Sequence, residues 1–133
     1  MRLAIILVIA TALVAFAAVE QVTIDKTFKK MGRETDALIQ MINAVPEDDE
    51  AYKSPVLVKE KIDYLHHYWI KTEKRLCVFM RHMELSYISD ALIYARNFVH
   101  FDNKEESCAG LERLRYLVDA YSHVFGINAL NMF

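Results

Sequence analysis

The chain has 133 residues, of which 54% are hydrophobic and 26% charged, and its formal net charge is −2. This apolar content excludes an intrinsically disordered chain, and the lack of a basic excess argues against a nucleic-acid partner. Only three glycines and two prolines are present, too few for the many turns of a β-sandwich or β-barrel. The composition therefore favours a single all-α domain built from long helices.

The first element is an apolar run over residues 3–19, in which Thr11 is the only polar residue. As a helix this run would be about 25 Å long, against about 30 Å for the hydrocarbon core of a bilayer. Residues 15–17, Ala-Phe-Ala, have the small-x-small pattern of a signal-peptide cleavage site. Residues 1–18 are therefore expected to be either a cleaved signal peptide or an N-terminal membrane anchor. A buried core helix is disfavoured, because the run has no polar stripe.

The charges that follow this run leave its orientation open. Lys26, Lys29, Lys30 and Arg33 lie beyond the run, but they are mixed with acidic residues. The similarity of residues 1–18 to a signal peptide favours an extracytoplasmic domain that is either membrane-anchored or secreted. No cysteine follows the run directly, which excludes a lipoprotein anchor.

Residues 19–133 are predicted to form an antiparallel bundle of three to four helices, over about 20–45, 55–82, 86–101 and 103–125. The first two helices are indicated by apolar residues whose spacing alternates between four and three. Pro46 is predicted to end the first helix and to begin an acidic loop. Ser54-Pro55 is typical of a helix N-cap followed by proline at the first helical position. The two stripes are Ile24, Phe28, Met31, Thr35, Leu38, Ile42 and Val45, and then Val58, Ile62, Leu65, Trp69, Thr72, Leu76, Phe79 and Met83.

A change of phase separates the second helix from the third. Continuing the second stripe would place Ser86 and Asp90 on the apolar face, whereas apolar residues recur from Leu85 onwards. We therefore predict a tight turn near residues 82–86, with Ser86 as the cap of the third helix. Short connections of this kind predict antiparallel neighbours.

The third helix carries a second apolar stripe. A helix with two apolar faces is either enclosed on both sides or presents one face to a partner. The candidate partner-surface residues are Tyr87, Tyr94, Phe98 and Phe101.

The fourth helix is expected to begin after Asp102, which would act as its N-cap with Glu105 as the capping-box partner. Gly126 is expected to end it in a left-handed conformation. The tail over residues 127–133 is apolar and is predicted to pack back on the bundle.

Catalytic and metal-binding motifs are missing from the sequence. There is no phosphate-binding loop, nucleophile elbow or Glu-x-x-His pair, so we expect no enzyme activity, no metal and no cofactor. The nearest ligand-like pairs are Asp63 with His66 and Asp119 with His123, which surface ion pairing explains equally well. The pair of His82 and Glu84 is interpreted as the end of the second helix rather than as a ligand site.

A basic row along the second helix has two interpretations. Lys71, Lys74, Arg75 and Arg81 lie near one another, with His67 on the same side, and could meet anionic lipid headgroups or an acidic wall polymer. Acidic residues nearby favour instead a neutralised, solvated face.

Cys77 and Cys108 form an even pair of cysteines, which in an exported protein suggests a disulfide. In an antiparallel bundle the two residues are offset by about 10 Å along the axis, too far for a bridge. Free thiols are therefore the favoured state.

The segment Trp69-Ile-Lys-Thr-Glu-Lys-Arg-Leu76, followed by Phe79, His82-Met-Glu-Leu85, Ile88 and Leu92, resembles a family of short bacterial proteins. Asp102, Lys104-Glu105, the leucines 111, 114 and 117, and Asn131-Met-Phe133 extend this resemblance over nearly the whole chain. The family is the one catalogued as domain of unknown function 4363. Met83 departs from it, because an acidic residue is common there. The resemblance implies an extracytoplasmic or membrane-anchored helical protein with no assigned activity.

These observations favour a non-enzymatic interaction or accessory module for an envelope or membrane protein. Residues 3–19 would hold it in the membrane if they are not cleaved. The alternative is a sensor that binds a small ligand or a metal in the bundle interior.

Overall fold

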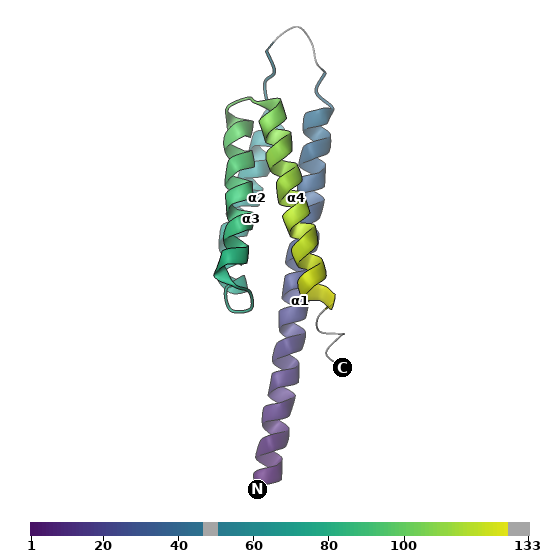
Figure 1. Ribbon diagram of the computed structural model, residues 1–133, viewed down its shortest axis with the longest axis vertical. Helices are drawn as coiled ribbons and strands as arrows, with labels where there is room; N and C mark the ends of the chain where they lie inside the picture. The colour runs from purple at the N-terminus through teal and green to yellow at the C-terminus, as the bar shows by residue number, and fades with distance from the viewer. Residues whose placement is uncertain (47–50, 128–133) are drawn as a thin grey trace.

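The computed structural model describes residues 1–46 and 51–127, and within these ranges it consists of four helices. α1 covers Arg2–Asn43, α2 Val56–Leu76, α3 His82–His100 and α4 Lys104–Ile127. The helices alternate in direction and form one bundle, and the first half of α1 projects from one end of it (Figure 1). The predicted all-α bundle following an N-terminal helix is confirmed.

The core is formed by the apolar stripes that the sequence indicates. On α1 and α2, the stripe residues from Ile24 to Ile42 and from Val58 to Leu76 are buried. Trp69 is only 1% exposed, and its Nε1 donates a hydrogen bond to Ser89 Oγ of α3 at 2.8 Å. Burying these faces against one another stabilises helices that would be marginal alone. The buried residues of the last two helices include Leu85, Ile88, Leu92, Ala95, Val99, Leu111, Leu114 and Val118.

α4 packs against both α1 and α3, and a glycine lies at each contact. At Gly110, an added Cβ would lie 2.9 Å from the Cα of Ala95, so the backbones of α3 and α4 approach one another there. At Gly32 of α1, an added Cβ would lie 3.5 Å from the guanidinium of Arg115, an ordinary contact distance.

The turn between α2 and α3 lies earlier than predicted. α2 ends at Leu76 and α3 begins at His82, so the chain reverses over residues 77–81 instead of 82–86. The backbone N–H groups of Phe79 and Met80 both donate to the carbonyl of Leu76, at 2.8 Å. This tight turn keeps the side chains of Phe79 and Met80 packed against the bundle. The apolar pattern of α2 therefore extends in the sequence beyond Leu76, where the helix ends.

The start of α4 also differs from the prediction. Asn103, not Asp102, caps the helix, since its Oδ1 accepts the backbone N–H of Glu106 at 3.0 Å. Asp102 adopts a left-handed conformation with φ 56°, and its carboxylate contacts the chain just before α2 instead. Asparagine and aspartate tolerate this conformation better than most residues.

The apolar run and the first bundle helix form one continuous element, α1. Two other expected helix ends are wrong. Ser86 donates to the carbonyl of His82 inside α3, so it does not cap that helix. α4 continues through Gly126 to Ile127. The centre of the expected acidic loop, residues 47–50, and the tail over residues 128–133 lie outside the described residues.

Candidate membrane anchor and interaction surfaces

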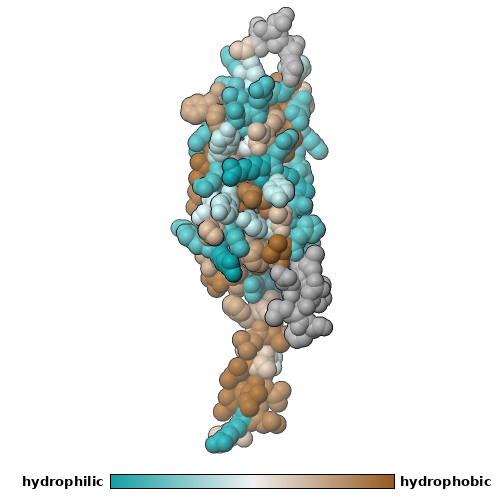
Figure 2. Space-filling view, viewed as in Figure 1, coloured by the Kyte–Doolittle hydropathy of each residue, from teal (hydrophilic) through white to brown (hydrophobic). Residues whose placement is uncertain are grey.

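The apolar run forms the projecting half of α1 and is uncovered. Every residue from 1 to 19 is exposed, and among the helices that the structure describes this one alone is long and apolar enough to cross a membrane. Figure 2 shows the projecting part as almost uniformly hydrophobic, next to a body of mixed polarity. A signal sequence has the same length and composition, so this feature fits both a retained anchor and a cleaved leader.

Thr11, the one polar residue of the run, is satisfied inside the helix. Its hydroxyl donates to the carbonyl of Leu7 at 2.8 Å. A hydroxyl that bonds its own backbone is the usual way for threonine to enter an apolar environment. The run therefore presents no unpaired polar side chain between residues 3 and 19.

The run joins the bundle without a hinge. α1 continues from the apolar run to its first buried residue, Ile24. The ring of Phe16 lies 5.4 Å from that of Phe79 in the α2–α3 turn, measured between ring centroids. The end of the run is thus in contact with the end of the bundle.

The structure gathers three of the four predicted partner-surface residues at the C-terminal end of α3. The rings of Tyr94 and Phe98 lie 4.7 Å apart and those of Phe98 and Phe101 6.4 Å apart. Tyr87 lies two turns away from this group, nearer the start of the helix, and is 43% exposed. Phe101 is 77% exposed and is the most exposed of the four residues.

Tyr94 also belongs to the contact between α3 and α4. Its hydroxyl donates to the carboxylate of Glu106 on α4, and this hydrogen bond raises the pKa of the tyrosine. Its ring lies against Gly110, where an added Cβ would be 2.9 Å from the ring. Tyr94 therefore takes part in helix packing although it is 42% exposed, whereas Phe101, at 77%, is the most exposed residue of the predicted surface.

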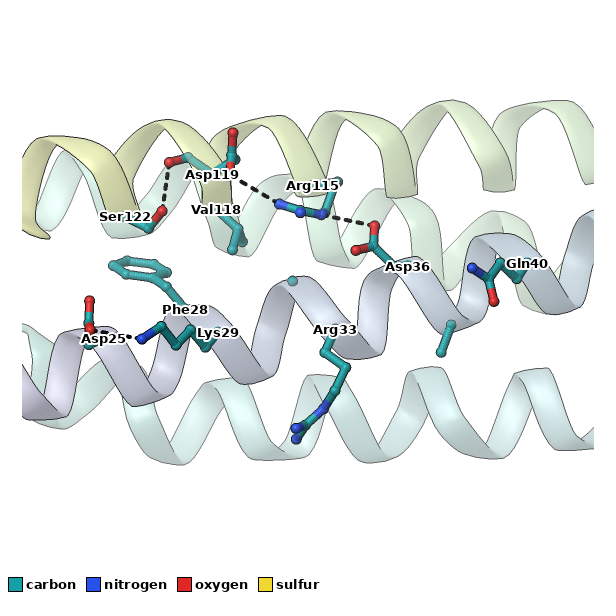
Figure 3. A pocket seen from close by; sticks show the side chains of 12 residues that line it. Asp25, Phe28, Lys29, Arg33, Asp36, Gln40, Arg115, Val118, Asp119 and Ser122 are labelled. Carbon is teal, nitrogen blue, oxygen red and sulfur yellow. Dashed lines mark hydrogen bonds and ion pairs between the residues drawn. The ribbon is translucent and has the colours of Figure 1, made fainter.

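A groove of about 530 Å³ runs between α1 and α4 (Figure 3). Arg115 lies over it, with Nε 2.9 Å from Asp36 and one terminal nitrogen 3.5 Å from Asp119. Lys29 is paired with Asp25 at 3.2 Å. Of these three ion pairs, only that of Arg115 with Asp36 joins the two helices, since the other two each lie within one helix. All three are partly exposed and contribute little to stability.

No local pattern in the sequence singles out this groove, because its residues are far apart in the chain. The available signal was Gly32, a lone glycine inside a helical pattern, which often marks a close approach of another element. Arg33, next to it, points away from Arg115 (Figure 3).

Of the two histidine pairs expected from the sequence, one forms: His123 Nε2 lies 3.9 Å from the carboxylate of Asp119. Asp63 pairs with Arg96 at 2.6 Å and with His100 at 3.0 Å, both on α3, rather than with His66. Desolvation alone would raise the pKa of Asp63, but the hydrogen bonds from these two partners leave it lowered. No group of three or more His, Cys, Asp or Glu residues placed to hold a metal occurs in residues 1–46 and 51–127.

The pair of His82 and Glu84 lies at the beginning of α3, not at the end of α2. The cations in the last turn of α2 are Lys74 and Arg75, which are placed to interact with its C-terminal carbonyls. His82 and Glu84 thus have no part in ending α2.

The acidic neighbours of the basic row along α2 and the α2–α3 turn make contacts other than ion pairs with it. Glu73 accepts a hydrogen bond from Ser89 at 3.1 Å, and one carboxylate oxygen of Glu84 is buried. The basic side chains are exposed, and none forms an ion pair with another residue that the structure describes. These are Lys71, Lys74, Arg75 and Arg81.

The two cysteines are free thiols near opposite ends of the bundle. Cys77 follows α2 at the end from which α1 projects, and Cys108 lies in the first turns of α4 at the other end. Burial raises the pKa of the Cys108 thiol, and the carboxylate of Glu112 adds to this shift. Their separation along the axis is larger than the sequence indicated, because the α2–α3 turn comes earlier.

Comparison with protein-family models gives one match. A model described as "Domain of unknown function (DUF4363)" matches residues 24–131, which begin at the first buried residue of α1. Comparison with curated proteins and with solved structures found no match.

Proposed function

Because the chain belongs to the DUF4363 family, whose description assigns no activity, we propose a function from its structure: a membrane-anchored accessory module that binds another membrane or envelope protein. In this proposal residues 3–19 stay in the chain and cross the membrane. The bundle stands outside the cytoplasm and acts by contact rather than by catalysis.

One observation carries the proposal: the apolar run is fully uncovered and continues as the same helix into the bundle core. A solvent-exposed apolar helix of this length is unfavourable in water and favourable in a bilayer. The contact between Phe16 and Phe79 supports retention, since cleavage after Ala17 would remove one of the two rings.

The exposed aromatic residues of α3 support the second half of the proposal. Large aromatic side chains are common anchors of protein interfaces. Phe101 lies just after α3, at the end of the bundle remote from the projecting half of α1, where a neighbouring protein has access to it. Tyr87, two turns before Tyr94, is 43% exposed.

The test is capture of partners from native membranes with chemical crosslinking. Phe101→Glu and Tyr87→Glu should lower the recovery of the same membrane proteins at least several-fold. Tyr116→Glu is the matched control, because Tyr116 is 72% exposed on α4 and lies outside the row. Equal recovery with all three variants, each folded by circular dichroism, would contradict a partner surface on α3.

A further inference from the structure

The α2–α3 turn lies at the level where the apolar half of α1 leaves the bundle. Both are at the same end of the molecule (Figure 1). The contact between the rings of Phe16 and Phe79 fixes this level. Phe16 is three residues before the end of the apolar run, which is about 5 Å along a helix axis. If residues 3–19 occupy the bilayer, the turn must therefore reach the membrane surface.

The turn exposes apolar side chains toward this level. Val78 is 70% exposed and Met83, in the first turn of α3, is 62% exposed. Their neighbours Phe79 and Met80 are held against the bundle, so Val78 and Met83 are free to contact something else. In water such an apolar tip is unfavourable, whereas the interfacial region of a bilayer accepts it.

Basic residues flank this apolar tip in the chain, in the last turn of α2 and just before α3. Lys74, Arg75 and Arg81 are exposed and form no ion pair within the described residues. The nearest carboxylates are engaged elsewhere, since Glu73 bonds Ser89 and Glu84 is half-buried. An apolar tip flanked by free cations is complementary to anionic phospholipid headgroups above an acyl layer.

We propose that the α2–α3 turn is a second membrane contact, in which Val78 and Met83 enter the interface and Lys74, Arg75 and Arg81 bind anionic phospholipid headgroups. This inference rests on the proposed retention of the anchor. Two contacts at one surface would fix the tilt of the bundle, which a single helix alone leaves free. The bilayer is the occupant we favour because the anchor itself brings it to the turn.

Cys77 provides a probe of this contact, because it is exposed and lies in the turn. In the full chain with Cys108→Ser, a fluorescent label on Cys77 reports its depth after reconstitution into phosphatidylglycerol vesicles. We expect quenching by nitroxide-labelled lipid and at least a several-fold loss of quenching by aqueous iodide. The matched control carries the label at Glu112→Cys in a chain with both native cysteines replaced by serine. Residue 112 is exposed on the far half of α4, so its label should remain open to iodide.

Substitutions separate the apolar and the electrostatic parts of the contact. Val78→Glu with Met83→Glu should restore iodide quenching at Cys77. Replacing Lys74, Arg75 and Arg81 by Gln should remove any difference between phosphatidylglycerol and phosphatidylcholine vesicles. All five side chains are exposed, so these variants should fold.

The outcomes distinguish this inference from the proposed function. Iodide quenching at Cys77 equal to that of the control, in a chain that still resists alkaline carbonate extraction, would overturn the membrane contact and leave the anchor intact. Release of the chain by carbonate would instead overturn the anchor. If the protection of the Cys77 label from iodide depends on the protein-to-lipid ratio, the tip contacts a second copy of the chain instead of lipid. This result would also overturn the lipid contact.

Discussion

The carboxylate of Asp102 accepts the backbone N–H of Ser54 at 2.8 Å, and so connects the α3–α4 turn to the chain that leads into α2. The same oxygen lies 2.9 Å from Nζ of Lys59. The left-handed backbone of Asp102 directs its carboxylate toward α2, away from the N-terminus of α4. Two connections at the far end of the bundle are thereby held together by one side chain.

Asp102→Ala should destabilise the bundle by about 1–2 kcal/mol, because it removes a charge-assisted hydrogen bond and an ion pair and adds strain at a positive φ. The exposure of roughly a third of the Asp102 side chain keeps this value small. Chemical denaturation measures the change. Glu112→Gln, which removes an exposed carboxylate on α4, should change the stability by less than about 0.5 kcal/mol. Equal effects of the two variants would contradict the role of Asp102.

The stability that Asp102 provides should depend on pH. The hydrogen bond from Lys59, followed by that from the Ser54 backbone, lowers the pKa of this carboxyl below its ordinary value. A lowered folded-state pKa gives stabilisation that is complete above the unfolded-state pKa of about 3.9 and is lost as the pH falls through the folded-state value. The difference in stability between the native chain and Asp102→Asn should therefore shrink in this acid range. A difference that stays constant down to pH 2 would contradict this assignment.

Gly110→Ala and Gly32→Ala should have opposite effects. At Gly110 the new Cβ would lie 2.9 Å from the backbone of Ala95 and from the ring of Tyr94, so α3 and α4 must move apart. We expect a loss of about 1–3 kcal/mol, despite the better helix propensity of alanine. At Gly32 the nearest atoms are 3.5 Å away on the flexible side chain of Arg115, so alanine should be neutral or stabilising by up to about 1 kcal/mol. Thermal unfolding of both variants measures this contrast, and a stabilising Gly110→Ala would contradict the close packing described.

Ser89→Ala should destabilise the chain by about 1–3 kcal/mol. The Ser89 hydroxyl accepts the indole N–H of Trp69 at 2.8 Å, and without it this buried donor has no partner. The emission of Trp69, the only tryptophan, should also change. Ser122→Ala is the control, since Ser122 bonds only the backbone of its own helix. An unchanged stability and emission spectrum for Ser89→Ala would argue against this hydrogen bond.

The helices could be predicted from the sequence because their apolar spacing survives in the core. Ile24 to Ile42 and Leu85 to Val99 are buried as the stripes require. The α2–α3 turn was misplaced because Phe79 and Met80 stay buried within it, so the apolar pattern does not end where the helix ends. Hydrophobic periodicity shows which residues are buried, not which are helical. Residues of a tight turn can be buried without belonging to a helix, as Phe79 and Met80 are here.

The surfaces were harder to predict than the core. The row of Tyr94, Phe98 and Phe101 follows from helical spacing, but the part of Tyr94 in helix packing depends on Gly110 of another helix. The pairing of Arg115 with Asp36 joins residues far apart in the chain and has no local signal. Contacts of this kind arise only once the helices are assembled.

Both the proposed function and the membrane contact of the α2–α3 turn require that residues 3–19 are retained as the anchor of the bundle. The most direct measurement is the intact mass of the protein in the membrane pellet after alkaline carbonate washing of cells that produce the full chain. We predict a carbonate-resistant protein whose mass includes residues 3–19. A washed-out or secreted product that begins at Ala18 would contradict the anchor, and with it the membrane contact of the α2–α3 turn.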